Sequence, residues 1–224
     1  MGNGTLGGMV YGGVLSDTIK LNEETLWSGE PRDLQNLTAK AYLPRIRKLL
    51  NESQTAAAQA LIDSVMLGEY NECYLPMGDL IISHSAHENY SNYRRELDLD
   101  QALVTTSYQV DGVDFKKEVF VSNPDQTLVV RISASEAGKL SFSAELQSLL
   151  HNSVLADGNS LVLNGQAPLH AYPHYLGKMD PVYEAGRGMK FQMRMEVLHE
   201  GGQVKMLNGR CEVEGADVVE FRLV

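Results

Sequence analysis

The sequence predicts a mainly β protein: an antiparallel sandwich of two sheets, with one short helical hairpin inserted near residues 40–67. Segments rich in β-branched and aromatic residues recur from residue 79 to the last residue. Turn signals such as Asp111-Gly112 and Asn208-Gly209 separate them at hairpin spacing. Ten or more strands in one open sheet would tend to curl or split. A two-sheet sandwich is therefore expected, as a single domain over residues 1–224.

The first third of the chain is expected to hold two strands and the helical hairpin. Residues 6–15 and 18–21 favour strands because they are rich in β-forming side chains. Apolar residues at helical spacing follow Pro44, and Asn51-Glu52-Ser53-Gln54 resembles a capping box that opens a second helix. The apolar face of that second helix consists of Ala57, Ala60, Leu61 and Val65. We therefore expect the hairpin to lie against a sheet.

The remainder of the chain is expected to be β-structure. Four successive strands should form a meander, at 104–110, 113–122, 127–134 and 139–147. A polar loop is expected at 151–160, and further strands at 161–164, 189–199 and 218–224. Glu200-Gly201-Gly202 and Asn208-Gly209 are expected to be hairpin turns. Because the last strand ends without a polar tail, we expect the chain to be cut inside or just after a strand at this end.

The charge of the chain argues against nucleic acid and membrane partners. The formal net charge is −10, the pI is about 5.0, and lysine and arginine are scattered. Gly2, Gly4 and Gly7 have the G-x-G-x-x-G spacing of a dinucleotide loop, but no strand precedes them, so they indicate a turn that leads into a strand. We expect no cofactor.

No residue stands out as catalytic or metal-binding. The carboxylate candidates are Glu23, Glu24, Asp98, Asp100 and Glu184. Asp98 and Asp100 alternate with leucines, so we interpret them as one solvated face of a strand.

The histidines and cysteines give no stronger signal. The pairs His84/His87 and His170/His174 lack a third ligand, so ordinary loop histidines are favoured over a metal site. The two cysteines, Cys73 and Cys211, are either bridged or free.

Four residues are candidates for contact with a sugar or with a neighbouring domain: Trp27, His170, His174 and Tyr175. Trp27, the only tryptophan, is either a core plug or a stacking platform. We expect it to be mostly buried, either anchoring its loop or partly covering a face on which another domain docks. The loop at 167–187 carries the other three residues and is too long for a bare hairpin connection. It either reaches toward another domain or packs on its own sandwich.

Several sequence blocks together resemble the N-terminal domain of glycoside hydrolase family 95. They are LNEETLWSGEPRD at 21–33, YLPMGDL at 74–80, YRRELDLDQALVTTSY at 93–108, VFVSNPDQTLVVRIS at 119–133, AGKLSFSAEL at 137–146 and GRGMKFQMRMEV at 186–197. MGNGTLGGMVYGG at 1–13 precedes them, and all these blocks occur in consistent order over nearly the whole chain. The family's usual segment before this glycine turn is missing, so the resemblance implies that the domain is truncated at its first strand as well.

The resemblance implies a non-catalytic N-terminal β-supersandwich that supports a catalytic (α/α)6 barrel absent from this chain. It implies that the parent protein is a glycoside hydrolase that removes a terminal fucose α-1,2-linked to galactose, with inversion of configuration at the anomeric carbon. An α-L-galactosidase is the other activity that the resemblance implies. The family's catalytic groups, a glutamate acid and an aspartate-assisted pair of asparagines, lie in the barrel. We therefore expect this chain alone to be inactive, and fucosylated oligosaccharide to be bound through the barrel.

The resemblance also bears on location and leaves one alternative. A role in glycan degradation predicts a secreted protein, periplasmic or extracellular in a bacterium. The alternative is an autonomous carbohydrate-binding module, which Trp27 and the loop at 167–187 would serve.

Overall fold

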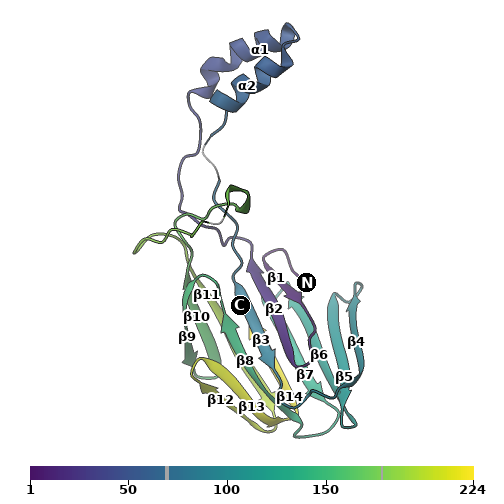
Figure 1. Ribbon diagram of the computed structural model, residues 1–224. Coiled ribbons are helices and arrows are strands. Elements are labelled where there is room, and N and C mark those ends of the chain that lie inside the picture. Colours follow the sequence, from purple (N-terminus) through teal and green to yellow (C-terminus); the bar gives the residue numbers. More distant parts are fainter. Residues whose placement is uncertain (69–70, 178) are drawn as a thin grey trace.

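The computed structural model describes residues 1–68, 71–177 and 179–224, and its strands form two antiparallel sheets (Figure 1). The six-stranded sheet contains, in spatial order, β1 (Leu6–Val10), β2 (Ser16–Glu23), β3 (Gly78–Ser83), β8 (Leu140–Gln147), β13 (Arg210–Ala216) and β12 (Gln203–Leu207). The eight-stranded sheet contains β4 (Ser91–Asp98), β5 (Leu103–Val110), β6 (Val113–Ser122), β7 (Thr127–Ala134), β14 (Val218–Leu223), β11 (Lys190–Glu200), β10 (Ser160–Gln166) and β9 (His151–Asp157). The predicted two-sheet sandwich is confirmed.

The core lies between the two sheets and is built from alternating side chains. In β3 and β5 every second residue is buried, as expected for strands with one face inward. Phe142 of β8 and Phe221 of β14 meet edge to face across the interior, with ring centroids 6.0 Å apart. Ile19 of β2, near the start of the chain, and Phe221 of the central strand β14, near its end, thus belong to the same core.

Three details of the strand predictions are wrong. Strands β5, β6 and β7 form the expected meander, but β8 crosses to the other sheet because the free edge of β7 pairs with β14. Residues 151–157 form β9 instead of a polar loop. Because β9 is an edge strand with both faces largely solvated, its sequence is polar and lacks the apolar pattern of a strand. The turn at 200–202 joins strands of different sheets and is no hairpin.

The glycine-rich opening is a turn that leads into a strand, as predicted. Asn3 Oδ1 accepts hydrogen bonds from the backbone N–H groups of Thr5 and Leu6, and Gly4 has a φ of 102°. The asparagine side chain therefore caps the turn, and Gly4 supplies a left-handed conformation that other residues rarely adopt.

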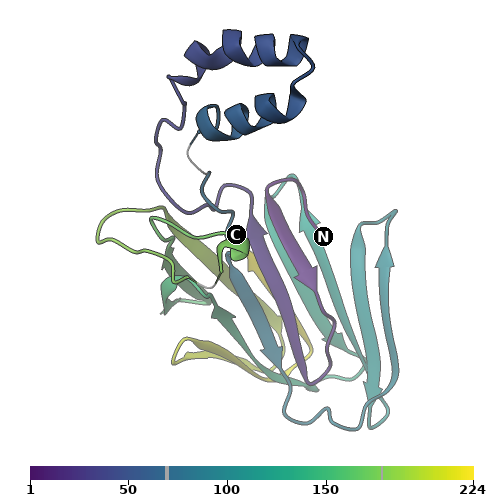
Figure 2. The same ribbon diagram turned by 45° about the horizontal axis from the view of Figure 1, so that its top comes forward.

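The helical hairpin exists, but it projects from the sandwich instead of lying against a sheet (Figures 1 and 2). It contains a 3₁₀ turn (Ala39–Tyr42), α1 (Leu43–Asn51) and α2 (Thr55–Val65), and we call residues 39–66 the arm. In its two helices only Ile46 and Ala58 are buried. The predicted capping box is wrong too, because α2 begins after Gln54 without a side-chain cap. Neither α1 nor α2 has the length and apolar character that a membrane-spanning helix needs.

A polar cluster is buried inside the sandwich beside the loop that connects β3 and β4. The rings of His84 and His87 stack with centroids 4.3 Å apart, and His87 Nδ1 lies 2.9 Å from the Tyr108 hydroxyl. Lys117 forms an ion pair with Asp17, whose Oδ1 accepts hydrogen bonds from two backbone N–H groups. This first histidine pair therefore lies in a loop, as expected, but it is buried in the core.

Burial makes the fold sensitive to acid at this cluster. Burial, aided by the positive charge of Lys117 and by His87, lowers the pKa of His84 to about 3 from the usual 6.5. Below pH 6.5, His84 therefore binds a proton in the unfolded chain but stays neutral in the folded chain until the pH nears 3. The free energy of unfolding should consequently fall as the pH falls. Between pH 6.5 and 5 this histidine should contribute up to about 1.4 kcal/mol per pH unit.

Urea unfolding at several pH values measures this slope. His84→Gln should flatten it, and the control His199→Gln, at an exposed position on β11, should leave it unchanged. An equal slope in the parent and in His84→Gln would contradict the account.

Candidate functional site

Three segments far apart in the sequence meet at one end of the sandwich, at the root of the arm. They are residues 24–34, residues 71–77 and the loop at 167–189 (Figure 1). The backbone N–H of Ser28 donates to the carbonyl of Cys73 at 2.9 Å, and that of Gly29 donates to the carbonyl of Pro168 at 2.9 Å. We call this region the loop end.

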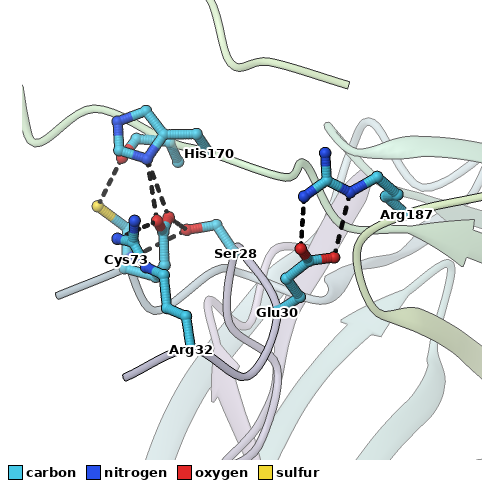
Figure 3. Close-up of polar contacts among 8 residues, drawn as sticks. Ser28, Glu30, Arg32, Cys73, His170 and Arg187 are labelled. Atoms are coloured by element: carbon cyan, nitrogen blue, oxygen red, sulfur yellow. Dashed lines mark hydrogen bonds and ion pairs between the residues drawn. The ribbon is translucent and has the colours of Figure 1, made fainter. Parts of the chain in front are cut away.

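The carboxylate of Glu72 connects these segments. It accepts hydrogen bonds from Ser28 Oγ at 2.7 Å, from Arg32 Nη2 at 2.9 Å and from His170 Nδ1 at 3.0 Å. Figure 3 shows Ser28, Arg32 and His170 converging on this network. Burial alone would raise the pKa of Glu72, but the hydrogen bonds from Ser28 and His170 outweigh it and hold that pKa below its usual value.

This arrangement is no nucleophilic triad. The carboxylate lies between the Ser28 hydroxyl and the His170 imidazole, so the imidazole is not positioned to take the serine proton. Ser28 Oγ also accepts a hydrogen bond from the backbone N–H of Cys73 at 2.9 Å. The network holds three segments together instead of activating a nucleophile.

A second polar bridge closes the other side of the loop end. Arg187 pairs with Glu30 through Nε and Nη2 (Figure 3). Its Nη1 donates to Glu184 Oε2 at 2.6 Å. The hydrogen bond from Arg187 lowers the pKa of Glu30, and the two carboxylates raise that of the guanidinium. All three side chains are exposed, so the bridge fixes orientation more than it stabilises the fold.

An open pocket of about 820 Å³ lies between the two bridges. It is lined by residues from 25–34, from 71–72 and from 186–189. Both charged pairs, Glu72 with Arg32 and Glu30 with Arg187, belong to its lining.

Trp27 stands on the rim of this pocket, and the prediction that it is mostly buried is wrong. It remains 43% exposed, because its neighbour Leu26 takes the inward position of the extended backbone and is 1% exposed. The indole N–H donates to the carbonyl of Glu24 at 3.1 Å. The indole and the Tyr74 ring pack edge to face, with ring centroids 5.6 Å apart. The ring is therefore held in place without being covered.

The other predicted site residues separate into two groups. His170 belongs to the Glu72 network, and its ring packs edge to face with that of Tyr172, with ring centroids 4.4 Å apart. His174 and Tyr175 lie in a short 3₁₀ turn (His174–Leu176), where they contact only each other among the ring contacts of the described residues. Tyr175 is 64% exposed. The base of the loop at 167–187 packs on its own sandwich, whereas this turn does not join the pocket.

The carboxylates and cysteines also differ from part of what the sequence suggested. Asp98 ends β4 and its Oδ1 accepts hydrogen bonds from the backbone N–H groups of Asp100 and Gln101, so Asp100 lies in a turn and shares no strand face with Asp98. Both cysteines are free: Cys211 is buried and the Cys73 thiol lies 3.3 Å from the carbonyl of Ala171.

Sequence reasoning missed Glu72 and Glu30 as site residues. Neither has a local pattern: the partners of Glu72 lie forty or more positions away in the sequence, and Arg187 lies more than one hundred and fifty positions from Glu30. The one available signal was the density of polar residues around Trp27.

Comparison with known proteins shows the family of the chain. Residues 1–223 match the family described as glycosyl hydrolase family 65, N-terminal domain. The chain belongs to this family. It is also 37% identical over 229 residues to alpha-L-fucosidase 2 of Arabidopsis thaliana, an alignment that covers 97% of this chain and 27% of the plant protein. It is 32% identical over 178 residues to probable alpha-fucosidase A of Aspergillus niger, covering 74% of this chain and 22% of the fungal protein.

These relatives are much longer than the chain, which spans about a quarter of their length. The matched family is described under family 65, and no comparison names family 95. The chain is thus an N-terminal glycoside hydrolase domain whose relatives are named as fucosidases.

The Glu72 network yields a prediction about the loop end. Glu72→Gln removes the charge that three donors share, so it should lower the free energy of unfolding by about 1–3 kcal/mol. It should also speed proteolysis in the loop at 167–187. The control Glu184→Gln, whose side chain is 48% exposed, should cost less than about 1 kcal/mol. Equal effects of the two variants in denaturant unfolding and limited proteolysis would contradict the role of Glu72.

Proposed function

We propose that the chain is the non-catalytic N-terminal domain of an α-L-fucosidase of the family 95 type. In the proposed parent protein, a separate (α/α)6 barrel hydrolyses a terminal α-1,2-linked fucose on galactose. The observation that carries the proposal is the 37% identity to alpha-L-fucosidase 2 over 97% of this chain. Because that match spans only 27% of the relative, the larger remaining part is available for the chemistry.

The state of the pocket carboxylates supports a non-catalytic role. An inverting glycosidase needs a general acid whose pKa is raised, so that it still holds its proton near neutral pH. The pKa values of Glu72 and Glu30 are both lowered by their hydrogen-bond donors. Each is therefore an ionised structural carboxylate, unsuited to protonating a leaving group.

The arm is the proposed docking element for the catalytic part. The two helices, of nine and eleven residues, pack on each other but bury only Ile46 and Ala58. Helices this short draw most of their stability from tertiary packing, and a docked domain would supply more of it. The arm leaves Leu50 50% exposed and Tyr42 37% exposed, and Leu67 beside it is 64% exposed. The last residue, Val224, lies toward the same end of the sandwich (Figure 2). A domain that follows in the parent protein would meet the arm there.

A periplasmic or extracellular location is proposed on the same ground, since glycans with terminal fucose are substrates outside the cell. Cys73 and Cys211 are both free, so the fold contains no disulfide between them that would require an oxidising compartment.

The first test is activity. The 224-residue chain should release no fucose from 2′-fucosyllactose, whereas the parent protein with its natural downstream sequence should release it. Fucose release by a clean preparation of the chain alone would contradict the proposal.

The second test removes the arm. Asn36 Nδ2 donates to the carbonyls of Val65 and Leu67 at 2.9 and 3.0 Å, so the two stems are close enough for a short glycine-serine link to replace residues 39–66. In the isolated chain this deletion should leave the melting temperature almost unchanged. In the parent protein it should lower the melting temperature and the activity. An arm deletion that harms neither in the parent would contradict the docking role.

A further inference from the structure

The open pocket at the loop end has the features of a sugar site in its own right. We propose that it binds a neutral oligosaccharide, with Trp27 as a stacking platform and with Arg187 and Asn71 as hydrogen-bonding partners. This inference gives the domain a ligand of its own, separate from hydrolysis, and does not depend on the proposed function.

Trp27 provides the apolar surface. Its indole N–H is already bonded to the carbonyl of Glu24, and the edge of Tyr74 fixes the ring, yet 43% of the residue stays exposed. A ring held in one orientation loses little conformational freedom on binding. The C–H face of a pyranose is the kind of flat, weakly apolar surface that such a ring can cover.

Arg187 and Asn71 provide polar contacts in the same pocket. An arginine side chain has five N–H donors, and the hydrogen bonds to Glu30 and Glu184 use three of them. Its guanidinium is thus fixed in a plane with donors to spare. Asn71 is exposed, and its amide has no hydrogen-bond partner among the residues at 1–68, 71–177 and 179–224. Its amide oxygen and N–H groups are complementary to sugar hydroxyls.

The charge balance of the lining selects a neutral ligand. Arg32 pairs with Glu72, and Arg187 pairs with both Glu30 and Glu184. The two arginines of the lining therefore leave no surplus positive charge to hold an anion. The chain as a whole carries a formal charge of −10, which repels phosphorylated and other anionic ligands. A volume of about 820 Å³ is within the range of small-molecule sites and accommodates a short oligosaccharide.

The pocket contains its own spectroscopic probe, because Trp27 is the only tryptophan. The 224-residue chain is titrated with 2′-fucosyllactose, with lactose and with 3′-sialyllactose while intrinsic fluorescence is recorded. A saturable change at millimolar concentrations of a neutral sugar, and a weaker one or none with the anionic sugar, is expected. Absence of a saturable change with both neutral sugars, or stronger binding of 3′-sialyllactose, would overturn the proposal.

Two variants test the named contacts. Arg187→Ala keeps the fluorescent probe and should weaken binding by about tenfold, since it removes donors held in place by carboxylates. The matched control Arg210→Ala removes an exposed arginine that pairs with Glu145 on the six-stranded sheet, and it should bind like the parent. Equal affinities of Arg187→Ala and the parent would contradict the proposed site.

Trp27→Ala lacks the probe, so its binding is measured by isothermal titration calorimetry, with circular dichroism to check that it folds. It should lose detectable sugar binding, while Tyr11→Ala, at an exposed tyrosine 48% accessible on another loop, should retain it. Retained binding by Trp27→Ala would overturn the platform role. Because every measurement uses this chain alone, the result does not depend on whether a catalytic part follows.

Discussion

The burial of two inner sheet faces against each other is the constraint on which the rest of the structure depends. Strands from the whole length of the chain contribute to one core, from Ile19 near the start to Phe221 near the end. Neither sheet could bury its apolar face alone. Since the core takes nearly every strand, the connections lie at the two ends of the sandwich, and the solvent-accessible polar networks of the loops collect there.

At the loop end this constraint is complemented by one carboxylate. Glu72 receives donors from the segment at 24–34 and from the loop at 167–187. It thus adds side-chain hydrogen bonds to the backbone bonds that Ser28 and Gly29 make between the three segments. The position of the pocket follows from that carboxylate and from the Glu30–Arg187 bridge (Figure 3). The arm rises from the same segments but adds little to the core, which fits the docking role proposed for it.

The sequence was sufficient for the parts of the fold that local patterns determine. Segments of β-forming residues, bounded by turn residues such as Asp111-Gly112, located β5, β6 and β7. Partner choice was not local: β8 leaves the meander because β14, far away in sequence, pairs with β7. Leu26 and Trp27 are adjacent, so only one of the two side chains can point into the core, and the sequence does not show which. In the structure it is Leu26. The Glu72 network was invisible because its members are polar residues spread over three segments.

The central claim is that the arm forms the surface on which a catalytic part packs, and hydrogen–deuterium exchange tests it most directly. Exchange is compared between the isolated chain and the parent protein with its natural downstream sequence. The account predicts slower exchange in the parent at residues 39–66, with the strands of the sandwich nearly unchanged. Equal exchange of the arm in the two proteins would contradict it.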